Sequence, residues 1–406
     1  SYYYKPNNMI SISNLVFRMK KNAVGLATIA ILSSMVLVTL VGAASIYAGK
    51  KDYLASATPH DYSVSGNKVD LTSTKKLMDD FLIKTGEQAN EEVAVSYLLF
   101  GIKNQETNKL TVFTKNERKV VPKSIVLVFS QETFKQLTGK ELNLSSNQIA
   151  LYTKNKTLKT QKSLSIDGKN YQIHRQLGDF INKKIPNIYK IIVSDYSYLV
   201  VPDIKIFESS MKGTSIAQAT YVGVNIKDPT HDAKKNLDLL DQIAGEATKQ
   251  LDSQTTGVPV SYFSANSRYD AEGMVNGFVG GTFFIGIFLS IIFMLGTVLV
   301  IYYKQISEGY EDRERFVILQ KIGLDDLQVK QTIRKQVLTV FFLPLIFAFI
   351  HLAFAYHMIS LIVRIIGVLN PDLMLVVTII VCGVFFLAYV LVFALTSRSY
   401  RRIVSM

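Results

Sequence analysis

The stretch that comes nearest to a cofactor-binding motif is GAASIYAGKK, at residues 42–51. Glycines ahead of a lysine are typical of loops that hold nucleotide phosphates with backbone N–H groups and an ammonium group. The spacing here differs from that of a phosphate-binding loop, and no serine or threonine follows the lysine to bind Mg²⁺. The sequence therefore predicts that this chain does not itself bind or hydrolyse ATP.

No other residue set has the spacing of a catalytic or metal site. The chain contains neither HExxH nor GxSxG, and its 5 histidines are scattered along the sequence. The only cysteine, Cys382, lies in an uncharged stretch and is expected to be a packing residue. We therefore predict no catalytic, cofactor-binding or metal-binding residue, and a chain that is not an enzyme.

The charged segment 306–336 has the pattern of a structure that a partner protein recognises. Phe316, Leu319 and Ile322 recur three residues apart among charges, which is typical of an amphipathic helix. Gly323 is expected to end that helix in the left-handed conformation. Asp325 is expected to cap a second helix, with a glutamine three residues later as its capping-box partner. A solvated loop explains the charge but not this concurrence of stop and cap.

The predicted turn carries apolar side chains at its tip. Leu324 precedes the cap and Leu327 follows it, and Asp326 complements the dipole of the second helix. We expect this elbow to project into the cytoplasm and fit a cleft on another protein.

Four long uncharged runs set the fold class. Each reaches the roughly 20 residues that a helix needs to cross a bilayer. The sequence predicts four transmembrane α-helices and a large mixed α/β extracellular domain inserted between the first and the second. The expected segments are an interfacial amphipathic helix (1–22), spans at 23–48, 273–303, 337–358 and 373–396, the domain (49–272), the elbow (304–336), an external loop (359–372) and a cytoplasmic tail (397–406).

Basic residues near the span ends predict the orientation. Lysines and arginines precede the first span, follow the last and are frequent in the elbow, which places both termini and the elbow in the cytoplasm. On the outer side, Lys50 and Lys51 follow the first span, and the loop between the third and fourth spans has only Arg364 as a basic residue. Much of the net charge of +13 then lies where anionic lipids attract it. An exported domain without cysteine is typical of a Gram-positive cell surface. We predict a multi-pass cell-membrane protein with no nucleic-acid partner.

Periodicity predicts the main elements of the inserted domain. Helical patterns cover 75–86, ending at Gly86, and 236–251. Lysine-rich 153–162 is expected to be a solvated hairpin, with an anion-binding segment as the alternative. Gly277 and Gly281, with Gly280 and Gly286 nearby, have the spacing that brings membrane helices together. His351 and His357 are expected to be polar residues satisfied by their neighbours, with sensing of protons or of a ligand as the alternative. The predicted strands are 93–100, 124–129, 148–153, 189–201 and 219–226.

NLVFRMKKNAVGLATIAILSSMVLVTL (14–40), the large insertion and EDRERFVILQKIGLDDLQVKQTIRKQ (311–336) together resemble FtsX-like ABC transporter permeases. They look most like the C-terminal half of BceB-type permeases, and SRSYRRIVS (397–405) is similar too. The resemblance implies that the elbow couples to a cytoplasmic ABC ATPase, which acts as a dimer and binds the ATP. By matching position, it also implies that the docking residues are Ile322, Gly323, Leu324, Asp325, Asp326 and Leu327. It also implies that the segment before the first span is an interfacial helix.

The same resemblance implies a mechanotransmission-type transporter. Such permeases give bacteria resistance to cell-wall-active peptides. The implied substrates are bacitracin, lantibiotics and similar peptides, or their complexes with lipid-linked cell-wall precursors. The resemblance also implies signalling to a membrane histidine kinase. The alternatives are an FtsX-type regulator of an external cell-wall hydrolase and a MacB-type exporter. Because BceB-type permeases carry further spans ahead of the domain, we expect part of a longer permease; a four-span chain that pairs with a second copy is the alternative.

Overall fold

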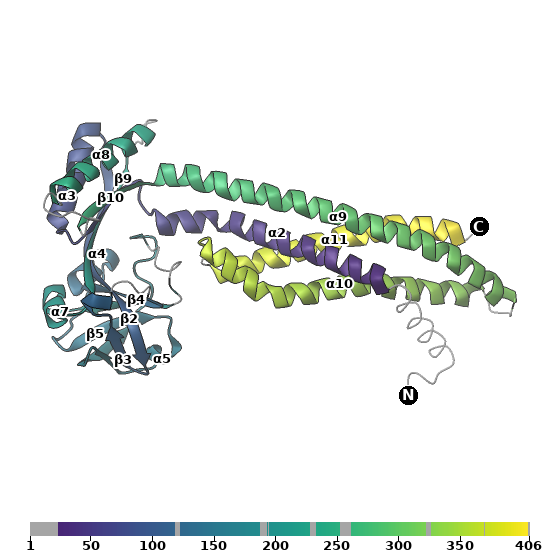
Figure 1. The fold of residues 1–406 in the computed structure, drawn as a ribbon, viewed down its shortest axis with the longest axis horizontal. Coiled ribbons are helices and arrows are strands. Elements are labelled where there is room, and N and C mark those ends of the chain that lie inside the picture. Colours follow the sequence, from purple (N-terminus) through teal and green to yellow (C-terminus); the bar gives the residue numbers. More distant parts are fainter. Residues whose placement is uncertain are drawn as a thin grey trace. The chain divides into compact units, whose positions relative to one another are not determined.

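The computed structural model describes residues 23–117, 122–186, 193, 195–227, 233–251, 261–321, 326–368 and 370–404 (Figure 1). It does not describe most side chains between 312 and 340, nor those of 397–404. The predicted interfacial helix (1–22) therefore lies outside the described residues. The chain divides into two units, one made of 1–49 and 278–406 and the other of 50–277.

The membrane unit consists of α-helices that are long and apolar enough to span a bilayer. They are α2 (Ala23–Ala57), α9 (Arg268–Lys321), α10 (Asp326–Ile365) and α11 (Pro371–Val404). The prediction of four spans with an α/β domain between the first and the second is confirmed. All of them continue beyond the hydrophobic core that they cross. In particular, α9 continues unbroken into the segment predicted as the elbow.

Helix α2 is the most enclosed of these helices. In its most apolar stretch 39% of the residues are buried, against 22% in each of the other spans. The other spans expose many large apolar side chains, among them Phe284, Phe354 and Leu387. Because apolar side chains gain nothing from facing water, these faces suit contact with lipid or with further helices.

The inserted domain is built on a 10-stranded mixed sheet. Its helices are α3 (Leu71–Thr85), α4 (Gln131–Thr138), α5 (Lys156–Lys159), α7 (Ile204–Ser210) and α8 (Ala233–Leu251), with a 3₁₀ turn at Lys115–Glu117. Its strands are β1 (Tyr62–Asn67), β2 (Ala89–Glu106), β3 (Lys109–Val112), β4 (Ser124–Ser130), β5 (Gln148–Thr153), β6 (Ser163–Ile166), β7 (Lys169–Gln176), β8 (Asp195–Val201), β9 (Ile216–Ile226) and β10 (Tyr262–Ser267).

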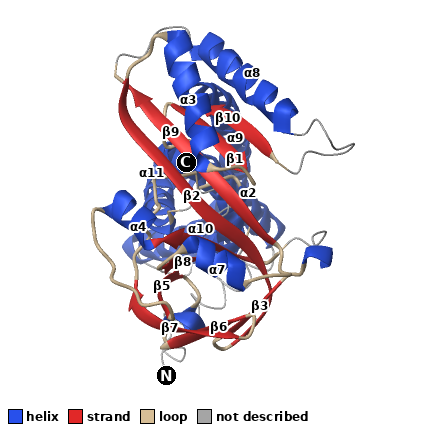
Figure 2. Ribbon diagram, turned by 90° about the vertical axis from the view of Figure 1, so that its left-hand side faces the viewer, coloured by secondary structure: helices blue, strands red, loops and turns tan. Residues whose placement is uncertain are grey.

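Strands β10, β1, β9 and β2 form one antiparallel half of the sheet, and α3 and α8 lie against it (Figure 2). Their shared core includes Phe81 of α3, Leu240 of α8 and Val222 of β9. Asp70 caps the start of α3 by accepting a hydrogen bond from the Ser73 N–H. The predicted stop at Gly86 is confirmed, because its φ of 72° is the left-handed conformation that favours glycine.

The other half of the sheet closes into a ring. The pairings run from β2 through β3, β6, β7, β5, β8 and β4 and return to β2. Alternate residues of β4 join different cores: Val126 and Val128 pack inside the ring, whereas Leu127 and Phe129 pack under α4 on its outer side. The ring is thus a filled barrel that shares its longest strand with the first half.

The expected hairpin at 153–162 is wrong. Residues 156–159 form the short helix α5, and the Asn155 side chain caps it by accepting hydrogen bonds from the N–H groups of Thr157 and Leu158. Leu158 is 2% exposed because it packs into the interior of the barrel. A single buried leucine therefore anchors this lysine-rich segment as a helical turn.

Candidate functional site

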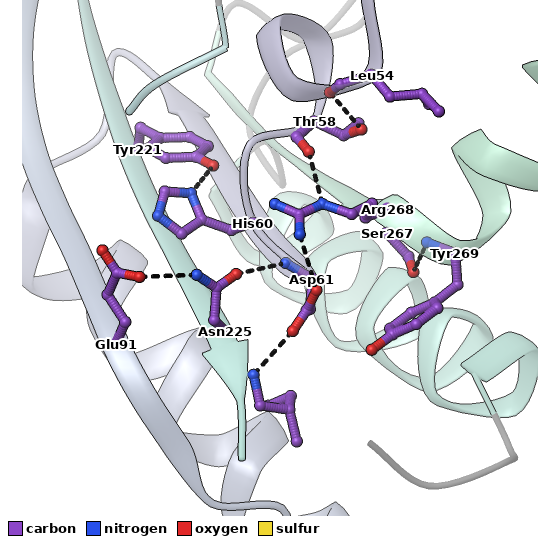
Figure 3. Close-up of polar contacts among 11 residues, drawn as sticks. Leu54, Thr58, His60, Asp61, Glu91, Tyr221, Asn225, Ser267, Arg268 and Tyr269 are labelled. Carbon is purple, nitrogen blue, oxygen red and sulfur yellow. Dashed lines mark hydrogen bonds and ion pairs between the residues drawn. The ribbon is translucent and has the colours of Figure 1, made fainter. Parts of the chain in front are cut away.

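A polar cluster lies where α2 and α9 join the sheet of the inserted domain (Figure 3). The register of β1 and β10 pairs Tyr62 with Ser267. The residues just beyond that pair, Asp61 and Arg268, therefore lie side by side at the ends of the two strands. Arg268 is also the first residue of α9, so the strand and the helix share this position.

Asp61 and Arg268 form an ion pair with additional hydrogen bonds. Arg268 Nη1 lies 3.3 Å from Asp61 Oδ1, and the two side chains are 30% and 13% exposed. The Arg268 Nε–H donates to the Thr58 carbonyl at 3.1 Å, just beyond the end of α2. The Arg268 N–H donates to the Asp61 carbonyl at 2.9 Å. One arginine thus joins the end of α2, the start of β1 and the start of α9.

The network continues from Asp61 to the end of β9 and to β2. Asp61 Oδ2 accepts a hydrogen bond from the Ile226 N–H at 2.9 Å. The Asp61 N–H donates to Asn225 Oδ1 at 3.2 Å, and Asn225 Nδ2 donates to Glu91 Oε2 at 2.9 Å. We name Thr58, Asp61, Asn225 and Arg268 the junction cluster. Its hydrogen bonds and ion pair connect the end of α2, β1, β9 and the start of α9.

His60 lies buried beside the junction cluster. Its Nδ1 is 2.8 Å from the Tyr221 hydroxyl, and the ring is 3% exposed. A Cβ on Gly223 would lie 2.5 Å from His60 Nδ1, so the ring fits only because residue 223 is glycine. Burial lowers the pKa of His60; Glu91 opposes this shift, Arg268 adds to it, and Asp61 opposes it. Burial also raises the pKa of Tyr221.

The lowered pKa predicts that the inserted domain loses stability in mild acid. As the pH falls below about 6.5, His60 becomes protonated in the unfolded chain but stays neutral in the folded chain. This difference lasts until the pH reaches the lowered pKa of His60 in the folded state. Across that window the free energy of unfolding should fall by at most about 1.4 kcal/mol per pH unit. Urea unfolding between pH 7.5 and 5.5 measures it. His60→Gln should remove this dependence, whereas His174→Gln, on exposed β7, should keep it; the same slope in both variants would contradict the assignment.

Helices α2 and α9 pack closely within the membrane unit. A Cβ on Gly286 would lie 2.3 Å from the Ala43 Cβ. The Thr39 and Ser290 hydroxyls are hydrogen-bonded at 3.0 Å. The rings of Tyr47 and Phe283 stack with their centroids 4.5 Å apart. Small and hydroxyl residues are the usual contacts between membrane helices, and here they hold together the two helices that continue into the inserted domain.

The predicted packing role of Gly277 and Gly281 differs from what the structure shows. Within the part of the chain that the structure describes, no atom lies within 4 Å of a Cβ built on either glycine. Gly286 makes the close contact instead. The spacing rule found the right helix, but it does not identify which face of that helix meets α2.

We predict that Gly286→Ala destabilises the membrane unit. The added methyl group overlaps Ala43, and overpacking of this kind costs about 1–3 kcal/mol. Thermal unfolding of the purified protein in detergent measures the loss. Gly281→Ala gains the same helix propensity without a contact and should be neutral or better. Ala43→Gly should restore stability to Gly286→Ala; failure of this rescue would show that the two helices do not meet here.

The two histidines in α10 were expected to be satisfied by neighbours. His351 Nδ1 lies 3.0 Å from the Ser34 hydroxyl of α2, which confirms that expectation for His351.

Among the described residues, no group of three or more His, Cys, Asp or Glu side chains could hold a metal ion.

The predicted docking tip lies largely outside the described residues. Helix α9 ends at Lys321 and α10 begins at Asp326, so Ile322, Gly323, Leu324 and Asp325 fall between them. Asp326 and Leu327 are the first residues of α10, and the structure does not describe their side chains. The structure therefore gives the helices on either side of the tip, and the role of the tip stays a prediction.

The junction cluster was not predicted from the sequence. Asp61 and Arg268 are 207 residues apart, and neither belongs to a motif. The available signal was their position, since each charged residue stands at the boundary between a helical run and a strand. Only the register of β1 against β10 brings them together.

Comparison with known proteins gives relatives of one kind, although no family model matches. The chain is 23% identical over 363 residues to the ABC transporter permease protein YxdM of Bacillus subtilis (strain 168), covering 87% of this chain and 52% of YxdM. It is 21% identical over 411 residues to the uncharacterized ABC transporter permease YvcS of the same organism, and the match covers 99% of this chain and 59% of YvcS. It is 21% identical over 363 residues to the bacitracin export permease protein BceB, also of that organism, covering 87% and 51%.

These relatives are all ABC transporter permeases, which supports the permease resemblance at a general level. The chain spans little more than half the length of each of them. A permease that uses ATP works with an ATPase, and the sequence of this chain contains no phosphate-binding loop of its own.

Proposed function

We propose that this chain is the permease, or the C-terminal part of the permease, of a mechanotransmission-type ABC transporter. A separate cytoplasmic ATPase dimer binds and hydrolyses ATP, and the tip at residues 322–327 docks on it. The observation that carries the proposal is helix α9, which runs without interruption from Arg268 in the junction cluster to Lys321, next to the tip.

A continuous helix is a suitable carrier of motion. At 1.5 Å per residue, the 54 residues of α9 extend about 80 Å if the helix is straight. Its hydrogen-bonded backbone resists stretching, so a displacement at one end reaches the other. The Gly286–Ala43 contact makes α2 move with α9. In the junction cluster, Arg268 then passes the displacement to Asp61 and through it to β1 and β9.

The proposed setting is the cell membrane of a Gram-positive bacterium, with both termini in the cytoplasm and the inserted domain outside. The proposed substrates are cell-wall-active peptides of the bacitracin and lantibiotic class, or their complexes with lipid-linked cell-wall precursors. The support is that one relative is named as a bacitracin export permease. A membrane histidine kinase is the proposed signalling partner, and this rests on the family resemblance alone.

Growth of a deletion strain tests the proposed function. A strain lacking the complete gene should become more sensitive to bacitracin or a lantibiotic, and the wild-type gene should restore growth. Antibiotics that act inside the cell are the matched control and should inhibit both strains equally. Unchanged sensitivity across a full panel of cell-wall-active peptides would exclude a role in peptide resistance.

A further inference from the structure

A polar cluster interrupts the apolar interior of the membrane unit near the end of the α9 span. Lys304 and Glu308 lie one helical turn apart, and their side chains are 13% and 11% exposed. Gln305, between them in sequence, is 7% exposed. The other face of the same turns exposes Tyr303 and Tyr310 at 67% and 59%. Exposed tyrosines are typical of the membrane–water interface, so the cluster lies at that depth but faces inward.

A small cavity adjoins this cluster. Its volume is about 20 Å³. All four helices contribute to its wall, which is formed by Leu26, Ile29, Ile301, Lys304, Gln305, Glu308, Phe341 and Tyr389. A cavity needs a volume of roughly 10–15 Å³ to hold one water molecule, so this cavity suits a single water and is too small for a lipid headgroup.

The amide of Gln305 needs a hydrogen-bonding partner. Both Oε1 and Nε2 are buried, and neither has a hydrogen-bond partner among the described residues. The Tyr389 hydroxyl is already engaged, since it donates to the Phe341 carbonyl at 2.9 Å. Leaving a buried amide unsatisfied is costly, and a water that bonds to both of its ends removes most of that cost.

The Lys304–Glu308 pair has room for the same water. Its Nζ–Oε1 distance is 3.9 Å, which is too long for a direct hydrogen bond and allows a bridging molecule. A lysine ammonium, a carboxylate and a primary amide together supply donors and acceptors on three sides. Buried waters typically make about three hydrogen bonds, so the wall matches the demand of one water.

We propose that Lys304, Gln305 and Glu308 form a buried water-binding site, and that this site lets α9 shift against α2, α10 and α11. Interlocked apolar side chains resist sliding, because displacement opens voids. A water-bridged contact re-forms after a small displacement, because the water can reorient. The second half of the proposal rests on the proposed function, in which α9 moves when the ATPase acts.

Hydroxyl-radical footprinting with a millisecond X-ray pulse tests the water site directly. The pulse generates radicals from bound water, which modify side chains beside it even when they are buried. Tyr389 and Phe341, 0% and 6% exposed, should therefore be modified rapidly in the wild-type protein. Phe385, which is 3% exposed but does not line the cavity, is the internal reference and should stay unmodified. Equal rates at all of these rings would overturn the site.

Gln305→Leu is the matched variant, because it keeps the side-chain size and removes the amide. It should lower the modification of Tyr389 at least fivefold, because the amide that holds the water is gone. Thr297→Val is the control, because the Thr297 hydroxyl is satisfied by the Phe293 carbonyl within α9. Unchanged modification of Tyr389 in Gln305→Leu would overturn the water site.

Peptide resistance separates the role in motion from the site itself. A folded Gln305→Leu variant should lose at least half of the resistance of the wild-type strain, whereas Thr297→Val should keep it. Full resistance in Gln305→Leu would overturn the role of the site in the motion of α9. The existence of the water site itself is then decided by the footprinting result. The deletion strain distinguishes the two failures: if it is already fully resistant, the proposed function itself has failed.

Discussion

Leu327→Asp should abolish peptide resistance while the protein still inserts into the membrane at its normal level. Fully burying a leucine in a partner's cleft contributes about 1.5–3 kcal/mol to binding, and an aspartate there adds an unpaired charge. Since 1.4 kcal/mol is a factor of ten, association with the ATPase should fall by roughly a hundredfold or more. Co-purification of the ATPase with the tagged permease measures this loss.

The position of Leu327 in the fold makes this variant informative. Leu327 is the second residue of α10, and acidic side chains are favourable in the first turn of a helix because they complement its dipole. The substitution should therefore spare the helix while it damages the contact. Gln331→Asp adds the same charge one turn further along and should be nearly silent. Full ATPase association and resistance in Leu327→Asp at normal expression would rule out the tip as the coupling element.

The main elements of the fold follow from local patterns in the sequence. Uncharged runs locate the spans because a bilayer requires about 20 apolar residues. Strand periodicity correctly locates β2, β4, β5, β8 and β9, and the period of three to four residues locates α3 and α8. These signals act within a few residues of one another, so a single sequence carries them in full.

Features that depend on contacts between distant segments could not be predicted in this way. The helix at 156–159 forms because Leu158 enters a barrel interior that exists only once distant strands close. Gly286, and not Gly277 or Gly281, meets Ala43, because the rotation of α9 against α2 decides the contact. Similarly, Gln305 belongs to a stretch expected to begin a cytoplasmic elbow, yet the helix continues and buries it.

The candidate site divides in the same way. The elbow was predicted from local signals, namely a glycine stop, a cap and flanking leucines, and its docking role from the family resemblance. Both stay predictions, because residues 322–325 lie outside the described chain. The junction cluster has no local signal, and the register of β1 on β10 creates it. In the proposed function both are needed, since the tip would receive the displacement and the cluster would pass it to the sheet.

Asp61→Ala should destabilise the inserted domain by about 2–4 kcal/mol, because it leaves the Ile226 N–H and the Arg268 guanidinium without their buried acceptor. Urea unfolding of the purified protein in detergent measures the loss.

Arg268→Ala should have a similar effect, and the double variant should lose much less stability than the sum of the two single losses, because either change alone breaks the shared network. Glu92→Ala breaks the exposed Lys75–Glu92 pair, whose side chains are 47% and 43% exposed, and should cost under about 1 kcal/mol. If the effects of Asp61→Ala and Arg268→Ala simply add, the two side chains act independently, and their ion pair does not couple α9 to β1.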